Sequence, residues 1–397
     1  MTRIVVVGAG LAGLTAALRL TQAGHVVTVL EARDRVGGRV HSVTLKNGAV
    51  AELGGEWLTQ DQKWVTGLAN ELGIPLSPVG VNFANRDLIG SPQVTVTEHK
   101  RVAELVAAAV GTLSDEERSR VSAAELFGRL DDGSDAFTIL RNRIEGSAGV
   151  PASSIGAFEL VGDFGIEETT YLRASGGNQS LAEAISDRLG DLRLEHPVAL
   201  IHSSDSGVSV MAGEATIEAD AVVVAIPLPH AENLVFDPPL DDEVIEALGR
   251  LTSGTAAKIV LSTDSLPDLV GLQSGEATWW CWTGSGAEGL PRRAVTGFAG
   301  TEAAIEAVAS SWPEQIMSAL PDVEFGSEQI VVDWGADEWS RGCYSALGPG
   351  QEAYLGVFEQ IGRVVFAGEY ILGAGSIDGA IESGERAAKR LHEYLAD

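Results

Sequence analysis

The sequence predicts an α/β protein with two domains, one built on a parallel sheet and the other a discontinuous α+β unit. Three observations support this fold class. Short apolar runs and a helical pattern at the N-terminus are typical of a strand–helix–strand unit over residues 4–31. The length of 397 residues exceeds that of a usual single domain. Strand and helix patterns then return without a fixed period, which excludes a repeat architecture.

The N-terminal unit begins with an apolar, β-branched run at residues 4–7, which is typical of a strand buried on both faces. From Leu11 onward, leucine and alanine recur at helical spacing, and Gly24 is a stop signal. Residues 26–30 form the second expected strand, with Glu31 at its end. The order strand, helix, strand predicts that the two strands are parallel neighbours joined by the helix.

The rest of the chain shows a mixture of both patterns. Helical patterns occupy residues 101–130, 181–189, 301–309 and 379–395, and strand patterns occupy residues 192–201, 208–211, 221–226, 257–261 and 294–299. Because no low-complexity linker divides the domains, we expect the chain to cross between them more than once. The first domain should comprise residues 1–75, 174–245 and 340–397, and the second should comprise residues 76–173 and 246–339.

The composition limits the classes of partner. The 27 Lys and Arg residues against 56 Asp and Glu residues give a net charge of −29, which argues against nucleic acid and anionic membranes and favours cationic small molecules. The main effect of this charge should be solubility. The two cysteines, Cys281 and Cys343, suit a reducing compartment, and no apolar run reaches the length of a membrane helix. We therefore expect a cytoplasmic protein without a membrane partner; a homodimer is left open.

Gly8, Gly10 and Gly13 form a G-x-G-x-x-G pattern between the first strand and the helix. The first glycine permits a tight turn, the second lets the backbone approach a pyrophosphate, and the third allows close packing of helix and strand. The free amides and dipole of the helix N-terminus stabilise that anion. Glu31 can accept hydrogen bonds from a ribose, and its charge disfavours a 2′-phosphate, which leaves NAD or FAD. The pattern predicts a Rossmann-type dinucleotide-binding domain.

The continuation Ala-Arg-Asp-Arg-Val-Gly-Gly-Arg at residues 32–39 has no role in a typical nicotinamide site. Together with the glycine pattern, it resembles the flavin-containing monoamine oxidase family. The resemblance continues, in the family's order, at residues 53–57, 176–179, 221–227, 366–369 and 375–388. It implies a two-dinucleotide-binding-domain flavoprotein, with a Rossmann-type FAD-binding domain and a discontinuous α+β substrate domain. The implied reaction oxidises an amine to an imine, which hydrolyses to an aldehyde or ketone, while O2 is reduced to H2O2.

The resemblance also implies a set of cofactor contacts. Glu31, Arg33 and Arg39 would contact ribose and phosphate, and Glu369 the diphosphate or ribitol. The backbone of Val198 would contact adenine, and the turn at residues 377–378 would face the pyrimidine side of the flavin. The expected cofactor residues are Gly8, Gly10, Ala12, Gly13, Glu31, Arg33, Arg39, Gly55, Val198, Trp334, Trp339, Cys343, Gly368, Glu369, Ile377 and Asp378.

Two segments hold the residues expected to act in the reaction. Lys258 lies in a strand pattern, where a buried ammonium must be paired, solvated or functional. The family has a lysine here that holds a water beside the flavin N5, so the resemblance assigns Lys258 to oxygen activation and water positioning. Cys343 matches a cysteine that bears FAD through an 8α-thioether in some members, with a buried free thiol as the alternative. Tyr344 would flank the amine with its aromatic face.

The sequence departs from the family at Ser376, where the motif has an aromatic residue that forms the second wall of the amine site. Either Trp279, Trp280 or Trp282 supplies the missing wall, or the substrate is bulkier or more polar than a simple arylalkylamine. For these tryptophans, an ordinary core or sheet face is the favoured expectation. The expected substrate pocket comprises Trp57, Trp280 and Ser376.

Other functions have weaker support. An L-amino acid oxidase of the same superfamily needs an arginine for the substrate carboxylate, and residues 54–57 offer none. A carbon–carbon desaturase and a non-enzymatic flavin-binding scaffold are the remaining alternatives. The sequence lacks the motifs of zinc proteases, P-loop kinases and G-x-S-x-G hydrolases, and we expect no metal site.

Overall fold

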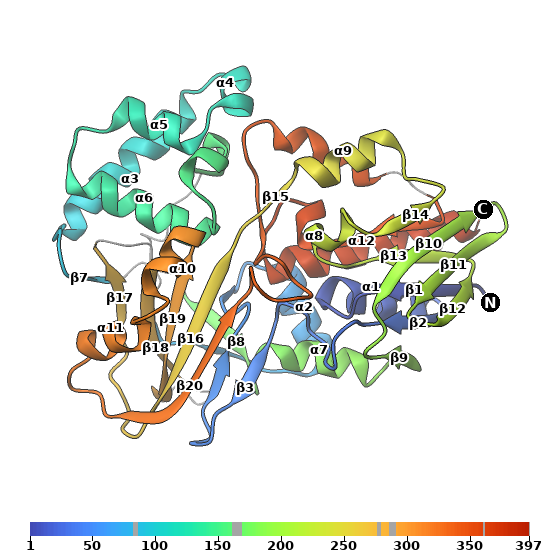
Figure 1. Ribbon diagram of the computed structural model, residues 1–397, viewed down its shortest axis with the longest axis horizontal. Helices are drawn as coiled ribbons and strands as arrows, with labels where there is room; N and C mark the ends of the chain where they lie inside the picture. The colour runs from blue at the N-terminus through green and yellow to red at the C-terminus, as the bar shows by residue number, and fades with distance from the viewer. Residues whose placement is uncertain (82–85, 161–168, 276–278, 286–290, 360–361, 397) are drawn as a thin grey trace.

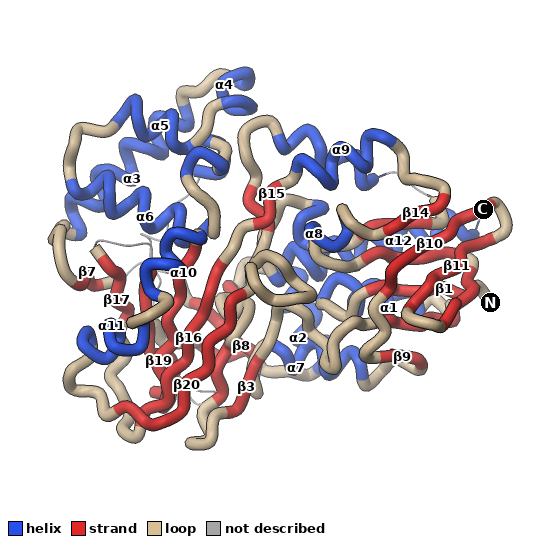
Figure 2. Tube along the Cα trace, in the orientation of Figure 1, coloured by secondary structure: helices blue, strands red, loops and turns tan. Residues whose placement is uncertain are grey.

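The structure is a computed structural model that describes residues 1–81, 86–160, 169–275, 279–285, 291–359 and 362–396. Its two halves lie side by side in Figure 1. One half is built on a parallel sheet and holds both chain termini. The other is built on a six-stranded sheet, with helices α3–α6 gathered near one end of that sheet (Figure 2). The predicted α/β fold class is confirmed, and the domain boundaries stay a prediction.

The parallel-sheet half contains five strands in the order β22-β13-β1-β2-β9. Their bounds are β1 (Arg3–Val7), β2 (Val26–Leu30), β9 (Asp191–Arg193), β13 (Ala221–Val224) and β22 (Val364–Phe366). Side chains alternate between the two faces, as the period of two requires. Ile4 and Val6 pack in one apolar cluster with the sheet-covering helices, whereas Val5 and Val7 pack in a second cluster on the opposite face. This double burial explains the continuous apolar runs in the sequence.

Four helices cover the first face of this sheet. They are α1 (Leu11–Gln22), α2 (Lys63–Leu72), α7 (Gln179–Ser186) and α12 (Ile377–Ala396). The other face is covered by the four-stranded sheet β12-β11-β10-β14 together with α8 (Leu228–Ala231) and α9 (Asp242–Arg250). The bounds of its strands are β10 (Val198–Ser204), β11 (Gly207–Ala212), β12 (Ala215–Ala219) and β14 (Val235–Asp237).

The expectation of one strand over residues 192–201 was wrong, because two strands of different sheets divide this segment. β9 pairs in parallel with β2, and β10 pairs with β11 in antiparallel fashion. The chain turns between them at Glu195, whose φ of 57° is incompatible with an extended strand. Pro197 then offers no N–H for a sheet ladder.

The six-stranded half has the strand order β20-β16-β19-β18-β17-β7. The bounds are β7 (Asp87–Ile89), β16 (Ala256–Thr263), β17 (Gly271–Ser274), β18 (Trp279–Ser285), β19 (Pro291–Gly300) and β20 (Phe325–Asp333). Trp279 and Cys281 on β18 pack with α10 (Glu302–Val308) and α11 (Trp312–Ala319). Trp280 and Trp282 alternate to the opposite face, where they pack with Trp57, which lies between β4 and β5. The tryptophan run therefore serves two different faces of one buried strand.

The helical pattern expected over residues 101–130 is realised as three helices with a fourth after them. These are α3 (Val96–Gly111), α4 (Asp115–Arg120), α5 (Ala123–Leu130) and α6 (Asp135–Ala148). Capping boxes at Thr95, Ser114 and Ser122 start the first three, each with a glutamate at the third helical position. The remaining strands are β3 (Ser42–Thr44), β4 (Val50–Glu52), β5 (Leu58–Thr59), β6 (Leu76–Pro78), β8 (Tyr171–Ala174), β15 (Thr252–Ser253) and β21 (Ser345–Ala346).

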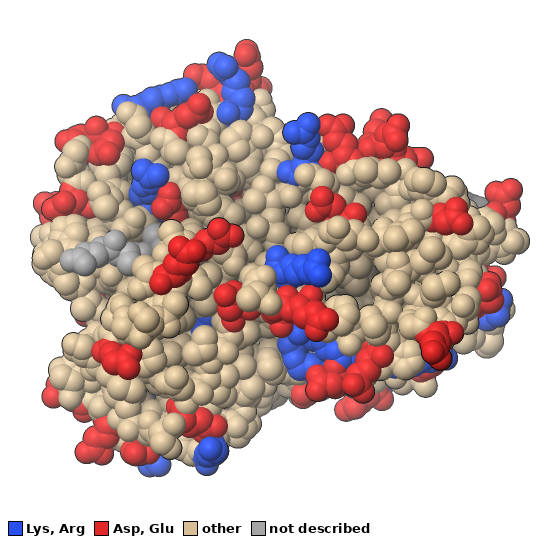
Figure 3. All heavy atoms as spheres, in the orientation of Figure 1, with Lys and Arg blue, Asp and Glu red and all other residues tan. Residues whose placement is uncertain are grey.

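The surface reflects the acidic composition. In Figure 3, acidic side chains spread over the visible face, and basic side chains lie among them rather than in one continuous area. Within the described ranges, every helix is too short or too polar to cross a membrane.

Close packing of α1 against α12 gives a stability prediction. A Cβ at Gly384 of α12 would overlap the carbonyl oxygen of Ala12 on α1. We expect Gly384→Ala to lower the free energy of unfolding by about 1–3 kcal/mol, because the two helices must move apart. The matched control is Gly67→Ala in α2, where a Cβ meets nothing within 4 Å. Urea unfolding should show the control unchanged or more stable by about 0.5–1 kcal/mol, and an unchanged Gly384→Ala variant would contradict this packing.

Candidate active site

A cavity of about 600 Å³ lies at the carboxyl ends of the parallel strands. Val7, Leu30 and Ala225 line it where β1, β2 and β13 end. Open α/β sheets bind ligands at this edge. Of the expected cofactor residues, the ones in its lining are Gly8, Gly10, Ala12, Glu31, Arg33, Arg39, Gly55, Val198, Trp339, Cys343, Gly368, Glu369 and Ile377.

The glycine turn between β1 and α1 has the shape that a pyrophosphate needs. Gly8 has a φ of 103°, and a Cβ there would overlap the backbone of Ala225. A Cβ at Gly13 would overlap the carbonyl oxygen of Gly8, so both positions require glycine. At Gly10, by contrast, a Cβ would meet nothing within 4 Å, and this residue is the N-cap of α1, where no side chain caps the helix. The space at Gly10 and the uncapped amides of α1 therefore fit a bound phosphate.

Glu31 and Arg33 shape the end of the cavity next to this turn. The Glu31 carboxylate accepts hydrogen bonds from the backbone N–H groups of Ala9 (2.7 Å) and Arg33 (2.9 Å). The Arg33 guanidinium pairs with Asp337 and donates to Ser340 Oγ at 2.8 Å. Each Glu31 oxygen keeps a second lone pair for a ribose hydroxyl.

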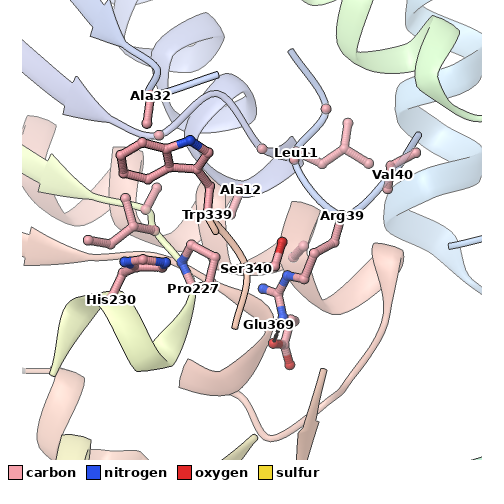
Figure 4. A pocket seen from close by; sticks show the side chains of 18 of the residues that line it. Leu11, Ala12, Ala32, Arg39, Val40, Pro227, His230, Trp339, Ser340 and Glu369 are labelled. Carbon is pink, nitrogen blue, oxygen red and sulfur yellow. Dashed lines mark hydrogen bonds and ion pairs between the residues drawn. The ribbon is translucent and has the colours of Figure 1, made fainter. Parts of the chain in front are cut away.

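Sequence reasoning missed several lining residues of this end, including His196, His230, Asn233 and Ser340. In Figure 4, His230 lies beside Pro227, and the Trp339 indole lies beside Ala32. The ring centroids of Trp339 and His230 are 6.0 Å apart. Burial, followed by the nearby charge of Arg341, lowers the pKa of His230, which favours its neutral imidazole. For His230 and Asn233 the available signal was their position shortly after β13, because ligands bind where parallel strands end.

Arg39 and Glu369 form an ion pair along the middle of the cavity (Figure 4). Arg39 Nη1 lies 2.8 Å from both Glu369 Oε1 and the carbonyl oxygen of Cys343. Glu369 Oε2 accepts from the backbone and hydroxyl of Ser345. This network connects the end of β22 with the segment that carries Cys343 and Tyr344.

The end of the cavity away from the glycine turn and Glu31 is where the second half of a dinucleotide would lie. If the glycine turn holds the pyrophosphate and Glu31 the adenosine ribose, an extended cofactor directs its other ring toward this end. We call it the ring end, and it comprises Gly55, Glu56, Trp57, Cys343, Tyr344, Ser376 and Ile377. Tyr344 donates from its hydroxyl to the carbonyl oxygen of Ser147 at 2.5 Å. Its side chain also borders a second cavity of about 350 Å³.

A stack of aromatic rings supports the wall of the ring end. Trp57 lines the cavity, and Trp280 stacks behind it with ring centroids 5.6 Å apart. Trp282 stacks on Trp280 at 4.0 Å, and Tyr171 meets Trp57 edge-on at 5.1 Å. Trp57 therefore contributes an aromatic side chain to the ring end, and Trp280, which is not among the lining residues, packs against it. Ser376 lines the cavity too, and its hydroxyl accepts from Gly379 N at 3.0 Å.

Lys258 lies behind the same wall and is ion-paired. Its ammonium donates to Glu56 Oε2 at 2.9 Å and to the carbonyl oxygens of Gly54 (2.9 Å) and Glu52 (3.2 Å). Three protein oxygens thus account for its three N–H groups. The water-holding role expected for Lys258 stays a prediction, and it requires that one of these bonds be released. Sequence reasoning missed Glu56, because nothing local to residues 53–57 shows what their side chains face.

Three other predicted cofactor residues support the wall from outside the cavity. Gly13 packs against the glycine turn, as described above. Trp334 donates from Nε1 to the carbonyl oxygen of Leu53 at 2.9 Å. Asp378 accepts from the backbone N–H groups of Trp64 (2.9 Å) and Val65 (2.8 Å), so its carboxylate caps α2 instead of facing the cavity.

Comparison with known proteins agrees with this site. The family model for flavin-containing amine oxidoreductases matches residues 11–392. Putrescine oxidase of Kocuria rosea is 29% identical, over 98% of this chain and 94% of its own length. Polyamine oxidase 3 of Oryza sativa subsp. japonica is 27% identical, over 97% of this chain and 88% of its own length.

Solved structures show the same fold. Cyclohexylamine oxidase from Brevibacterium oxydans IH-35A superimposes with a TM-score of 0.86 at 20% identity, over 100% of both chains. A putrescine oxidase structure with bound putrescine gives 0.84 at 24% identity, over 100% of this chain and 99% of that one. Because the family match spans nearly the whole chain and the cavity provides the turn that an FAD pyrophosphate needs, the chain belongs to the flavin-containing amine oxidoreductases, which are FAD-dependent enzymes that oxidise amines.

Proposed function

We propose that this amine oxidase uses dioxygen as its electron acceptor and releases hydrogen peroxide. An amine bound at the ring end is oxidised to an imine, which water hydrolyses to an aldehyde or ketone. Bound FAD supplies the two-electron chemistry. The observation that carries the proposal is the pair of aromatic side chains, Trp57 and Tyr344, that line the cavity at the end opposite the glycine turn. They orient an amine and exclude water from it.

The geometry of the ring end supports an amine larger than a simple arylalkylamine. Ser376 lines the ring end with a small side chain at the position where the family motif has an aromatic residue. The second cavity shares Tyr344 and Gly375 with the first and adds room for a longer substrate. The names of the relatives, putrescine oxidase, polyamine oxidase and cyclohexylamine oxidase, cover aliphatic and cyclic amines. We therefore propose aliphatic di- or polyamines and cyclic amines as the substrate class.

An amino acid substrate is disfavoured by the charges in the cavity. An L-amino acid dehydrogenase of a Synechocystis strain is 25% identical over 98% of this chain. A carboxylate at the ring end needs a guanidinium there, but the residues that define the ring end include no arginine, and Arg33 and Arg39 elsewhere in the lining are already paired with Asp337 and Glu369. The two cysteines, both free and buried, support action in a reducing compartment, which we propose is the cytoplasm.

A substrate panel tests the function directly. We expect peroxide release and anaerobic bleaching of the yellow protein with di-, poly- or cyclic amines, and none with L-amino acids. The rate should rise from mild acid to mild alkali, because an amine cannot release a hydride equivalent while a proton occupies its lone pair. Stopped-flow reduction at a series of pH values measures this. A flat profile, or bleaching by amino acids alone, would contradict the proposal.

Variants of Tyr344 separate the ring from its hydroxyl. Tyr344→Phe keeps the aromatic face and loses the bond to Ser147, so kcat/KM should fall about fivefold or less, the equivalent of about 1 kcal/mol. Tyr344→Leu also removes the ring, and a further loss of up to about 30-fold is expected, or about 2 kcal/mol. Tyr394→Leu on α12, far from the cavity lining and partly exposed, is the control. Equal losses for the Phe and Leu variants would show that the ring itself does not contact the amine.

Cys343 at the ring end provides a test of covalent attachment. Burial raises the pKa of this thiol to about 12, so we expect the link to form only after FAD has bound. Forming the thioether removes one hydrogen from sulfur and one from the 8α-carbon, and dioxygen takes up the electron pair. After denaturation, yellow colour should remain on the wild-type chain and be extracted from Cys343→Ala. If all colour leaves the wild-type chain, Cys343 is a packing residue beside Ala256 and Trp334.

A further inference from the structure

A buried cluster of charged side chains lies directly behind the ring end. Its members come from segments far apart in the sequence, and each is at least nine-tenths buried. Two are carboxylates and three are cations: Glu52, Glu56, Arg173, Lys258 and Arg292. Glu56 also lines the cavity, so the cluster extends to the cavity wall. The oxidation chemistry described above assigns no role to Glu56 or to the two arginines.

Glu56 is the centre of this cluster. Its Oε2 lies 2.9 Å from Lys258 Nζ, and its Oε1 lies 3.1 Å from Arg292 Nη2 and 3.7 Å from Arg173 Nη1. Trp282 Nε1 donates to the same Oε1 at 3.3 Å. Burial alone would raise the pKa of Glu56, but the charges of Lys258, Arg292 and Arg173 outweigh burial and bring it to about 2. Glu56 is therefore an anion at any working pH.

The cluster carries more positive than negative charge. Its three cations face Glu56 and Glu52, which leaves at least one positive charge in excess. Burial, and then the negative charge of Glu56, raise the pKa of Glu52, which increases that excess when Glu52 is protonated. Solvent screens a buried charge far less than an exposed one, so the excess acts on a neighbouring ring.

Lys258 of the cluster, together with Trp334 and Asn178, fixes the backbone of the cavity wall. We call residues 52–56 the strap. Lys258 donates to its carbonyl oxygens at Glu52 and Gly54, and Trp334 donates to that of Leu53. Asn178 Nδ2 donates to the carbonyl oxygens of Gly55 and Glu56, both at 3.0 Å. Side chains from elsewhere in the chain thus occupy five consecutive carbonyl groups of the strap, and Lys258 is held where Glu56 and the strap place it.

We propose that Glu56 is a positioning residue that sets the charge acting on the flavin: it holds Lys258 against the strap and offsets the positive charge that Lys258, Arg173 and Arg292 direct at the ring end. The inference rests on the proposed binding of FAD with its ring at that end. Reduction makes the ring more negative, so the excess cations stabilise the reduced form, and the Glu56 carboxylate opposes them. The balance of the two sets the ease with which the ring accepts electrons.

Opposite shifts in two variants of one ion pair test this role. Glu56→Gln removes the opposing anion and should raise the midpoint potential of the bound flavin. It should also tighten the binding of sulfite, an anion that adds to electron-poor flavins, by tenfold or more. Lys258→Gln removes a cation and should weaken sulfite binding by tenfold or more. A tenfold change in a two-electron equilibrium corresponds to about 30 mV. The double variant should return close to the wild type, because removing one positive and one negative charge leaves the net charge of the cluster unchanged.

A purely structural role predicts a different pattern, because loosening the strap from either side would move both single variants in the same direction. The control is Glu71→Gln, which removes a carboxylate paired with Arg19 near the surface and should leave the potential unchanged. Single variants that shift together, or that do not shift, would overturn the inference.

Loss of one partner from a buried pair is destabilising, so Glu56→Gln has the greatest risk of not folding. In that event Lys258→Gln is compared with the double variant, which should bind sulfite more tightly than Lys258→Gln, and equal affinities would overturn the inference. Failure of the wild-type protein to bind FAD would instead contradict the proposed function. The two failures are therefore distinguishable.

Discussion

The parallel-sheet half depends on one constraint, the close approach of backbone atoms around the turn between β1 and α1. A side chain at Gly8 would overlap the backbone after β13, and one at Gly13 would overlap the turn itself. Glu31 at the end of β2 closes the same turn by accepting from Ala9 N. Because α12 packs on α1 through Gly384 with similar closeness, a shift of the turn would have to move both helices. The uncapped amides of α1 face the cavity only because these close backbone contacts fix the position of the helix.

The opposite wall is held by pairs that are very distant in sequence. Arg33 reaches Asp337, and Arg39 reaches both the backbone of Cys343 and the carboxylate of Glu369. These contacts attach the Cys343–Tyr344 segment to the half that carries the glycine turn. The arginines that the family resemblance assigns to phosphate binding therefore also position the aromatic side of the amine site. Packing of Trp57 on Trp280 does the same from the six-stranded half.

Features that depend on the local spacing of residue types could be predicted from the sequence. The glycine turn, the apolar strands and Glu31 could be placed correctly, because periodicity and the φ preference of glycine are local properties. Contacts between side chains that lie far apart in the sequence could not be predicted. That a buried Lys258 needs a partner was foreseeable from its strand, but Glu56, two hundred positions earlier, was not. Likewise, Asp378 caps α2 and Trp280 supports Trp57, and only tertiary contacts decide either outcome.

The buried cluster behind the ring end and the molecule as a whole have net charges of opposite sign, and the difference explains why composition says little about the chemistry. The net charge of −29 arises mainly from exposed acids, whose fields solvent and salt screen within about 8–10 Å. Behind the ring end, Lys258, Arg173 and Arg292 are desolvated, and their fields are screened far less. An acidic exterior can attract a protonated amine, whereas this buried cationic cluster acts only on what already occupies the cavity. Recruitment of the amine and control of its oxidation are thus assigned to different residues, which can vary independently.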